Sequence, residues 1–210
     1  MAKNTLHLYY RPGACSLAPH ILLEHIGADY ILTEAPRDDG YRAINPTGAV
    51  PALDLGDRDI LTQCDAILHF ICATHDRSDL TGGDDVRQQA EVMKWCAFLT
   101  GDFHPAFFPV FVPKRYSTDQ SADAQRHLKA AGLELVKNGL GLIDTHLSGL
   151  NTFVGNGLTV VDFYAVPMLR WAAHSLPDGL APWPATDAFY QQLCDHPAVR
   201  SAMQAQGIAP

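Results

Sequence analysis

The sequence predicts an α/β module followed by an all-helical one, and three observations indicate this fold class. In the first 74 residues, strand and helix patterns follow the order strand, helix, strand, hairpin, helix. Residues 75–85 then turn polar, as segments between domains commonly do. Beyond them only helical patterns remain. We therefore expect one domain over residues 1–78 and a second over residues 85–210.

The first half of the α/β module has clear local signals. Residues 6–10 are apolar and aromatic, which is typical of a short strand. Residues 16–26 carry apolar side chains three or four positions apart and predict a helix. Pro19 falls in its first turn, where a missing N–H costs little, and Gly27 is suited to end it. Residues 30–33 predict a second strand.

The rest of the module reads as a turn, a hairpin and a helix. Asn45 to Gly48 is a turn sequence. Residues 50–55 and 59–61 predict a hairpin joined near Gly56 and Asp57. Residues 64–73 predict a helix with one apolar face.

Four further helices are predicted in the second module. They cover residues 86–99, a long segment, residues 159–173 and residues 185–194, with Pro197 closing the last. The apolar spacing that marks the long helix is that of Leu128, Ala131, Leu135 and Leu142. Thr159 and Asp162 form a capping box at the start of the third helix, and Leu158 and Phe163 are spaced for a hydrophobic staple.

Composition excludes several classes of protein. Fifteen basic against 23 acidic residues give a net charge of −8, which disfavours nucleic acid and anionic membrane as partners. No apolar run reaches the roughly 18 residues of a spanning helix, and the first residues lack a signal-peptide core. Five widely spaced cysteines without a Cys-x-x-Cys pair favour free thiols in the cytoplasm. Ten scattered histidines give no metal-ligand spacing, so we expect no metal.

Cys15 is the first candidate for chemistry. It lies between a turn and a helix start, where free N–H groups and the helix dipole favour thiolate over thiol. We therefore expect a lowered pKa, with Cys15 either attacking or donating a hydrogen bond to a bound thiolate. A small buried cysteine is an equally good reading of the position alone. Ser16 is suited to the donor role as well, or to capping the helix.

Residue patterns alone do not decide the roles of three further features. His104 ends a predicted helix and is suited to accept a proton from a thiol, although a locally satisfied histidine is the commoner case. The Val50–Pro51 bond is expected to be trans on spacing, because few X–Pro bonds are cis. The aromatic residues around Phe103 to Tyr116 are core or the lining of an apolar pocket between the modules.

Taken together, several blocks resemble bacterial beta-class glutathione transferases. The blocks occur in the family's order and span nearly the whole chain. They are Leu8 to His20, Asn45 to Leu53, Leu61 to Ile67, the box with Asp162, and Leu169–Arg170–Trp171.

The resemblance implies the glutathione transferase fold, with a thioredoxin-like N-terminal domain, an all-helical C-terminal domain, and a homodimer with a detoxifying role. It implies a cis Val50–Pro51 bond and glutathione as co-substrate. Cys15 then lies next to the glutathione sulfur, with Ser16 as a substitute and His104 as the acid–base or orienting group. The residues implied to bind glutathione are Cys15, Val50, Pro51, Gln63, Cys64, Asp65, Asp102, His104 and Arg37.

The chain departs from the family pattern at several of these positions. Gln63 replaces an acidic residue, and Cys64 replaces Ser or Gly at the γ-glutamyl position. The loop from Glu34 to Ala43 lacks the Lys for the glycyl end, where Arg37 or Arg42 is a substitute. Three functions follow: conjugation of glutathione to a small apolar electrophile, glutathione-dependent thiol–disulfide exchange, and glutathione transferase-like binding without catalysis.

Overall fold

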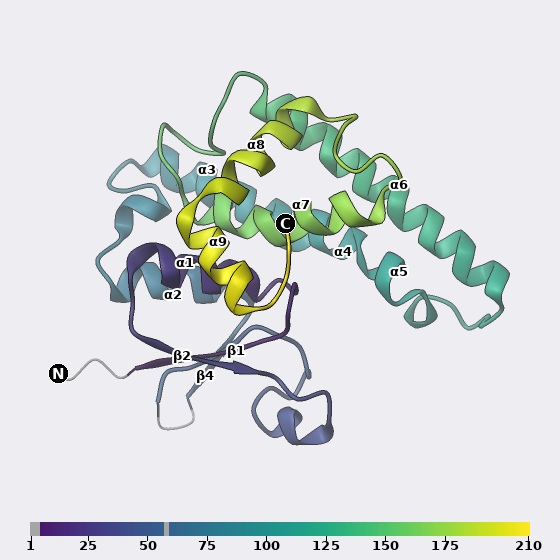
Figure 1. Ribbon diagram of the computed structural model, residues 1–210, viewed down its shortest axis with the longest axis horizontal. Helices are drawn as coiled ribbons and strands as arrows, with labels where there is room; N and C mark the ends of the chain where they lie inside the picture. Colours follow the sequence, from purple (N-terminus) through teal and green to yellow (C-terminus); the bar gives the residue numbers. More distant parts are fainter. Residues whose placement is uncertain (1–4, 57–58) are drawn as a thin grey trace.

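The computed structural model describes residues 5–56 and 59–210 and confirms the predicted fold class (Figure 1). A small sheet and two helices form the first part of the molecule, and helices form the rest. In the described residues, no helix has both the length and the apolarity needed to cross a membrane. The exact domain division at residues 78 and 85 stays a prediction.

The sheet has four strands in the order β2-β1-β3-β4. β1 and β2 are parallel, as a strand–helix–strand unit requires, and β3 pairs antiparallel with both β1 and β4. The hairpin prediction is confirmed, while Asp57 at its expected joint lies outside the described residues. The strands are β1 Leu6–Tyr10, β2 Tyr30–Glu34, β3 Ala52–Asp54 and β4 Ile60–Thr62.

Two helices cover one face of this sheet (Figure 1). α1 spans Leu17–Ile26 and ends at Gly27, whose φ of 64° is the left-handed geometry that glycine adopts without strain. α2 spans Cys64–Thr74. A 3₁₀ turn at Asp39–Ala43, which the sequence analysis did not predict, follows β2.

The helical part confirms the four predicted helices and adds others. α9 was missed because Pro197 was expected to end a helix, whereas it occupies the first turn of a new one, after His196. The bounds are α3 Val86–Phe98, α4 His104–Ala106, α5 Phe108–Phe111, α6 Ala122–Leu147, α7 Val160–Ser175, α8 Pro184–Asp195 and α9 Pro197–Ala205.

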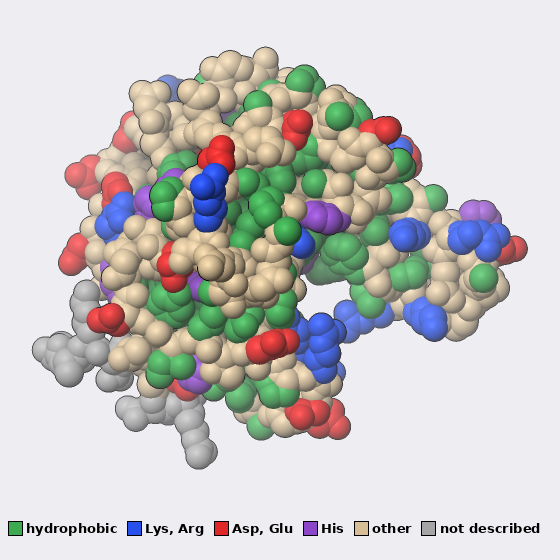
Figure 2. Space-filling model, viewed as in Figure 1, with side chains coloured by type: hydrophobic (Ala, Val, Ile, Leu, Met, Phe, Trp, Pro, Cys, Tyr) green, Lys and Arg blue, Asp and Glu red, His purple; other side chains and the backbone are tan. Residues whose placement is uncertain are grey.

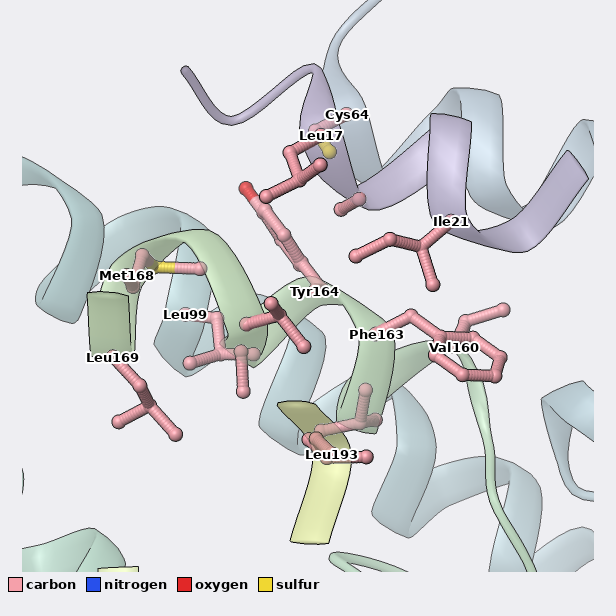
Figure 3. Packing of buried hydrophobic residues seen from close by; sticks show 14 of the residues in the cluster. Leu17, Ile21, Cys64, Leu99, Val160, Phe163, Tyr164, Met168, Leu169 and Leu193 are labelled. Atoms are coloured by element: carbon pink, nitrogen blue, oxygen red, sulfur yellow. The ribbon is translucent and has the colours of Figure 1, made fainter. Parts of the chain in front are cut away.

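α7 lies at the centre of the hydrophobic core. The main cluster of the core includes residues of both modules, and a second, small cluster contains Ala35, Tyr41 and Ala52. Figure 3 shows Phe163 and Tyr164 of α7 pointing toward Leu17 and Ile21 of α1. The predicted capping box at Thr159 and Asp162 is confirmed at the helix start. Because α1 and α2 pack on α7, the loops that precede them are fixed relative to the helical part.

The long helix α6 is confirmed, but its predicted apolar face is wrong. Leu135 and Leu142 are 55% and 60% exposed. The buried face instead contains Gly132, Val136 and Gly139. The glycines let α6 approach its neighbours closely: a Cβ at Gly139 would lie 2.5 Å from Cδ2 of the buried Phe103.

Because of this close approach, we expect replacement of two glycines of α6 to change stability in opposite directions. Gly139→Ala should lower the free energy of unfolding by about 1–2 kcal/mol, because overpacking against Phe103 outweighs the better helix propensity of Ala. Gly141→Ala should raise it by up to about 1 kcal/mol, since nothing lies within 4 Å of a Cβ there. Urea unfolding of both variants measures the pair; equal shifts would contradict the packing account.

Candidate functional site

Cys15 lies in the loop between β1 and α1, with its thiol turned inward. The side chain is buried, and Sγ donates a hydrogen bond to the Val50 carbonyl oxygen at 3.2 Å. Burial raises the pKa of the thiol to about 12, and the hydrogen bonds from the backbone N–H groups of Cys15 and Ser16 lower it less. The predicted lowering of this pKa is wrong for the free protein, because loss of hydration outweighs the helix start. Cys15 is therefore a thiol and a hydrogen-bond donor.

Ser16 holds this loop together. Its side chain is fully buried, and Oγ accepts from the Arg11 backbone N–H at 3.1 Å and lies 3.4 Å from the Arg11 carbonyl oxygen. It makes no capping hydrogen bond to α1, so the capping alternative is wrong.

The loop before β3 faces Cys15 and contains a cis Val50–Pro51 bond. The resemblance implied this isomer, and the trans expectation from spacing is wrong. The Asn45 amide and the Tyr41 hydroxyl both donate to the Ala49 carbonyl oxygen, at 2.7 and 2.9 Å. Arg11, which the sequence analysis did not select, donates to the Gly48 carbonyl oxygen at 3.0 Å.

The start of α2 lies against the same loop. Cys64 is buried, and its thiol donates a hydrogen bond to the Cys15 carbonyl oxygen at 3.5 Å. Burial, and then the neighbouring Cys15, raise the pKa of Cys64 well above its usual value. Gln63 is exposed and has φ of 72°, a strained geometry for a non-glycine residue of the kind that clusters at functional sites. Asp65 turns its carboxylate toward His69, with 3.4 Å between Oδ1 and Nε2.

His104 reaches this region through a π-helical turn. α3 does not simply end near residue 99, because Leu99–Phe103 forms a π-turn that leads directly into α4, and Asp102 is exposed on it. Burial lowers the pKa of His104 to about 4, so the imidazole is neutral. Its ring centroid lies 5.0 Å from that of Trp171, whose indole N–H donates to the Gly13 carbonyl oxygen at 2.7 Å. Trp171 thus links His104 to the loop of Cys15.

An apolar surface continues from Trp171 toward solvent. The Phe111 ring lies 5.5 Å from Trp171, and Phe108 lies 5.0 Å from His104. Phe108, Phe111, Val112 and Tyr116 all belong to the exposed large apolar residues. The residue pattern here was compatible with either core or pocket lining. The structure gives both, because Phe103 and Phe107 are buried.

Positive charge gathers beside this surface, although the chain is acidic overall. Figure 2 shows an open notch between the sheet module and the end of the molecule that carries α5 and the start of α6, with Lys and Arg side chains along both sides. Arg37 is exposed in the loop after β2. Such a notch attracts an anionic ligand against the long-range repulsion of the net charge of −8.

The C-terminal residues complete the site from the far end of the sequence. Gln206 is buried, and its side-chain oxygen accepts from the Gly13 backbone N–H at 3.1 Å. Its amide nitrogen lies 3.0 Å from His20 Nδ1. Gln206 was not among the predicted site residues, because a single polar residue gives no local sign of a contact 193 positions away.

Comparison with known proteins agrees with this geometry. Residues 13–74 match the family model of the glutathione S-transferase N-terminal domain, and residues 99–197 match that of the C-terminal domain. The chain is 37% identical to glutathione S-transferase GST-4.5 of Xanthomonas campestris, over 97% of this chain and 100% of that protein. A sphingomonad glutathione S-transferase complexed with glutathione has a TM-score of 0.83 at 34% identity, and a bacterial beta class glutathione S-transferase of Sphingomonas chungbukensis has 0.84 at 32%. Both structural alignments cover 97% of this chain and 100% of the other.

The chain therefore belongs to the glutathione S-transferase family and is an enzyme that uses glutathione as co-substrate. Within that family it is a bacterial beta-class member.

Proposed function

We propose that the enzyme joins the glutathione sulfur to an electrophilic carbon of a small apolar substrate. The observation that carries this proposal is the buried Cys15 thiol, which donates its hydrogen bond to the Val50 oxygen in the free protein. A thiol in that environment is a poor nucleophile and a good donor. It would stabilise a glutathione thiolate beside it, and that thiolate, rather than Cys15, would attack.

Neighbouring groups support the same reaction. The neutral His104 imidazole is suited to orient the glutathione thiol by accepting a hydrogen bond from it, while the thiol proton would leave to water, because a pKa of about 4 makes this imidazole a weak base. The exposed apolar surface at Phe108 and Phe111 is suited to hold the electrophile. Ser16 would become a second hydrogen-bond donor to the glutathione sulfur only after the loop rearranges, because the Ser16 hydroxyl is engaged with the Arg11 backbone.

The glutathione backbone would lie along the loops that surround Cys15. Val50 and Pro51 would pair with the cysteinyl part through the Val50 peptide groups. Gln63, Cys64 and Asp65 would bind the γ-glutamyl carboxylate through backbone N–H groups at the start of α2, where the helix dipole favours negative charge. Asp102 on the π-turn and Arg37 after β2 would contact the two ends of the tripeptide as polar neighbours.

A conjugation assay with an activated aryl halide tests this function. Cys15→Ala should lower kcat/KM about 10- to 100-fold, since a hydrogen bond to a charged group contributes about 1.5–3 kcal/mol. His104→Ala should also lower it. The matched control is Cys72→Ala, another buried cysteine, which should leave the rate unchanged. Unchanged rates in both site variants would refute the assigned roles. Reduction of hydroxyethyl disulfide that is lost in Cys15→Ser would favour thiol–disulfide exchange, and no heat with millimolar glutathione would favour binding without catalysis.

We also propose a homodimer with a detoxifying role in the cytoplasm. Large apolar side chains lie exposed on α3 and α6, among them Met93, Leu135 and Leu142, which supports a partner surface there. The five cysteines are all free, in line with a reducing compartment. Light scattering should give a mass of about twice 22.9 kDa, whereas the single-chain mass would refute the dimer.

A further inference from the structure

A cluster of three potential metal ligands lies outside the groups that act on the glutathione sulfur. Asp65 and His69 stand one turn apart on α2, and Cys96 of α3 faces them. One carboxylate oxygen, one imidazole nitrogen and the Cys96 sulfur all lie within 4.8 Å of one another. Sequence spacing gave no reason to expect this site, because the third ligand comes from another helix.

The hydrogen bonding of Asp65 is incomplete. Its Oδ1 is buried without a well-aligned hydrogen bond: His69 Nε2 lies 3.4 Å away, and the Cys96 thiol is the other polar group that the carboxylate meets. A buried carboxylate oxygen is costly without a partner. A cation between the three side chains would supply that partner and would use the sulfur and imidazole that already face it.

We propose that Asp65, His69 and Cys96 bind a divalent cation of the Zn²⁺ type. Mixed sulfur, nitrogen and oxygen ligands favour this borderline-soft class over Mg²⁺ or Ca²⁺, which take oxygen ligands. Ligand atoms of a tetrahedral zinc site are about 3.5 Å apart, so the cluster needs to close by about 1 Å. Binding replaces the Cys96 S–H bond by a sulfur–metal bond and releases one proton to solvent.

The exposure of the ligands indicates an open coordination position. Cys96 is fully buried, whereas the side chains of His69 and Asp65 are 35% and 39% exposed. The ion would therefore enter from the Asp65 and His69 side and keep a water molecule there. Since it would tie the first turns of α2 to α3, it would stabilise the folded chain by binding it and not the unfolded chain.

Titration of the whole protein with Co²⁺, in the absence of glutathione, tests the site. We expect the near-ultraviolet charge-transfer band of a thiolate–cobalt bond, at one ion per chain, and its loss when Zn²⁺ is added. Cys96→Ala should abolish the band, and His69→Gln should weaken Co²⁺ binding at least tenfold. Cys64→Ala and Cys72→Ala, which remove thiols on the same helix α2, should retain it.

A second measurement does not depend on the Cys96 variant folding well. Zn²⁺ should raise the melting temperature of the wild-type protein and of Cys72→Ala, and not that of His69→Gln, whose replacement is at a partly exposed position. A missing thiolate band, or a band that survives Cys96→Ala, would overturn the site and leave an ordinary ion pair beside a buried thiol. Neither readout involves conjugation, so failure here leaves the proposed function untouched.

Discussion

Replacing Asp162 by Ala is expected to lower the free energy of unfolding by about 4 kcal/mol. Asp162 is fully buried at the start of α7. Its Oδ1 accepts from the Phe153 backbone N–H at 2.9 Å, and its Oδ2 accepts from the Thr159 N–H and hydroxyl at 2.7 and 2.9 Å. Alanine would leave two buried N–H groups without a partner and remove the capping box, at about 1–3 kcal/mol for each orphaned group.

Thermal unfolding measures this loss directly. A chain of this length should melt about 10 °C lower for such a change. Asp123→Ala is the matched control, because Asp123 also lies in the first turn of a helix but is 72% exposed, and it should change stability by less than about 0.5 kcal/mol. If the two variants melted together, the Asp162 network would not be what fixes the start of α7.

Acidification from pH 6.5 to pH 4 should remove about 3 kcal/mol of stability through His20. This side chain is fully buried, with Nε2 2.8 Å from the Tyr30 hydroxyl and Nδ1 3.0 Å from the Gln206 amide nitrogen. Burial lowers the pKa of His20 to about 4, while Glu24 raises it to a smaller extent. The unfolded chain therefore protonates His20 near pH 6.5, whereas the folded chain protonates it only near pH 4. The stabilisation is complete above pH 6.5 and is lost as the pH falls.

Urea unfolding at pH 7 and at pH 4.5 reveals the size of this effect. His20→Gln should be less stable than wild type at pH 7 and should lose less on acidification. The lowered pKa of His104 adds to the wild-type loss, while burial raises the pKa of Asp162 to about 6 and opposes it; the His20 replacement changes neither group. His127→Gln, on the exposed side of α6, is the control and should keep the wild-type difference. A His20→Gln variant with the full wild-type loss would place the acid sensitivity elsewhere.

Local signals predicted the elements whose causes are local. The glycine after α1, the capping box of α7 and the pairing of β3 with β4 across a short turn each depend on a few neighbouring residues, and all three are confirmed. The predicted packing face of α6 was wrong because it was placed on the leucines. The actual contact depends on Phe103 fitting against Gly139. That fit involves two distant segments, and spacing along one helix contains no information about it.

The same distinction between local and long-range causes holds for the candidate site. The placement of Cys15 before a helix start was correct, but its pKa depends on burial beneath the Val50 loop, which the sequence does not reveal. The link from His104 through Trp171 to Gly13 and the meeting of Cys96 with Asp65 both join residues of different elements. The resemblance to a known family supplied the cis Val50–Pro51 bond, for which spacing alone favoured the opposite isomer.

The hydrogen bond from Gly13 to Gln206 has a consequence for variants with additions or deletions near residue 210. Two residues beyond Gly207, the Ala209 carbonyl oxygen also accepts from Arg170 Nε at 2.6 Å, so the last residues of the chain are fastened beside the loop that presents Cys15. A purification tag or fusion partner attached after residue 210 would start close to that loop, and removal of residues 206–210 would delete the Gln206 and Ala209 contacts. Kinetic constants measured on such fusions would describe an altered enzyme.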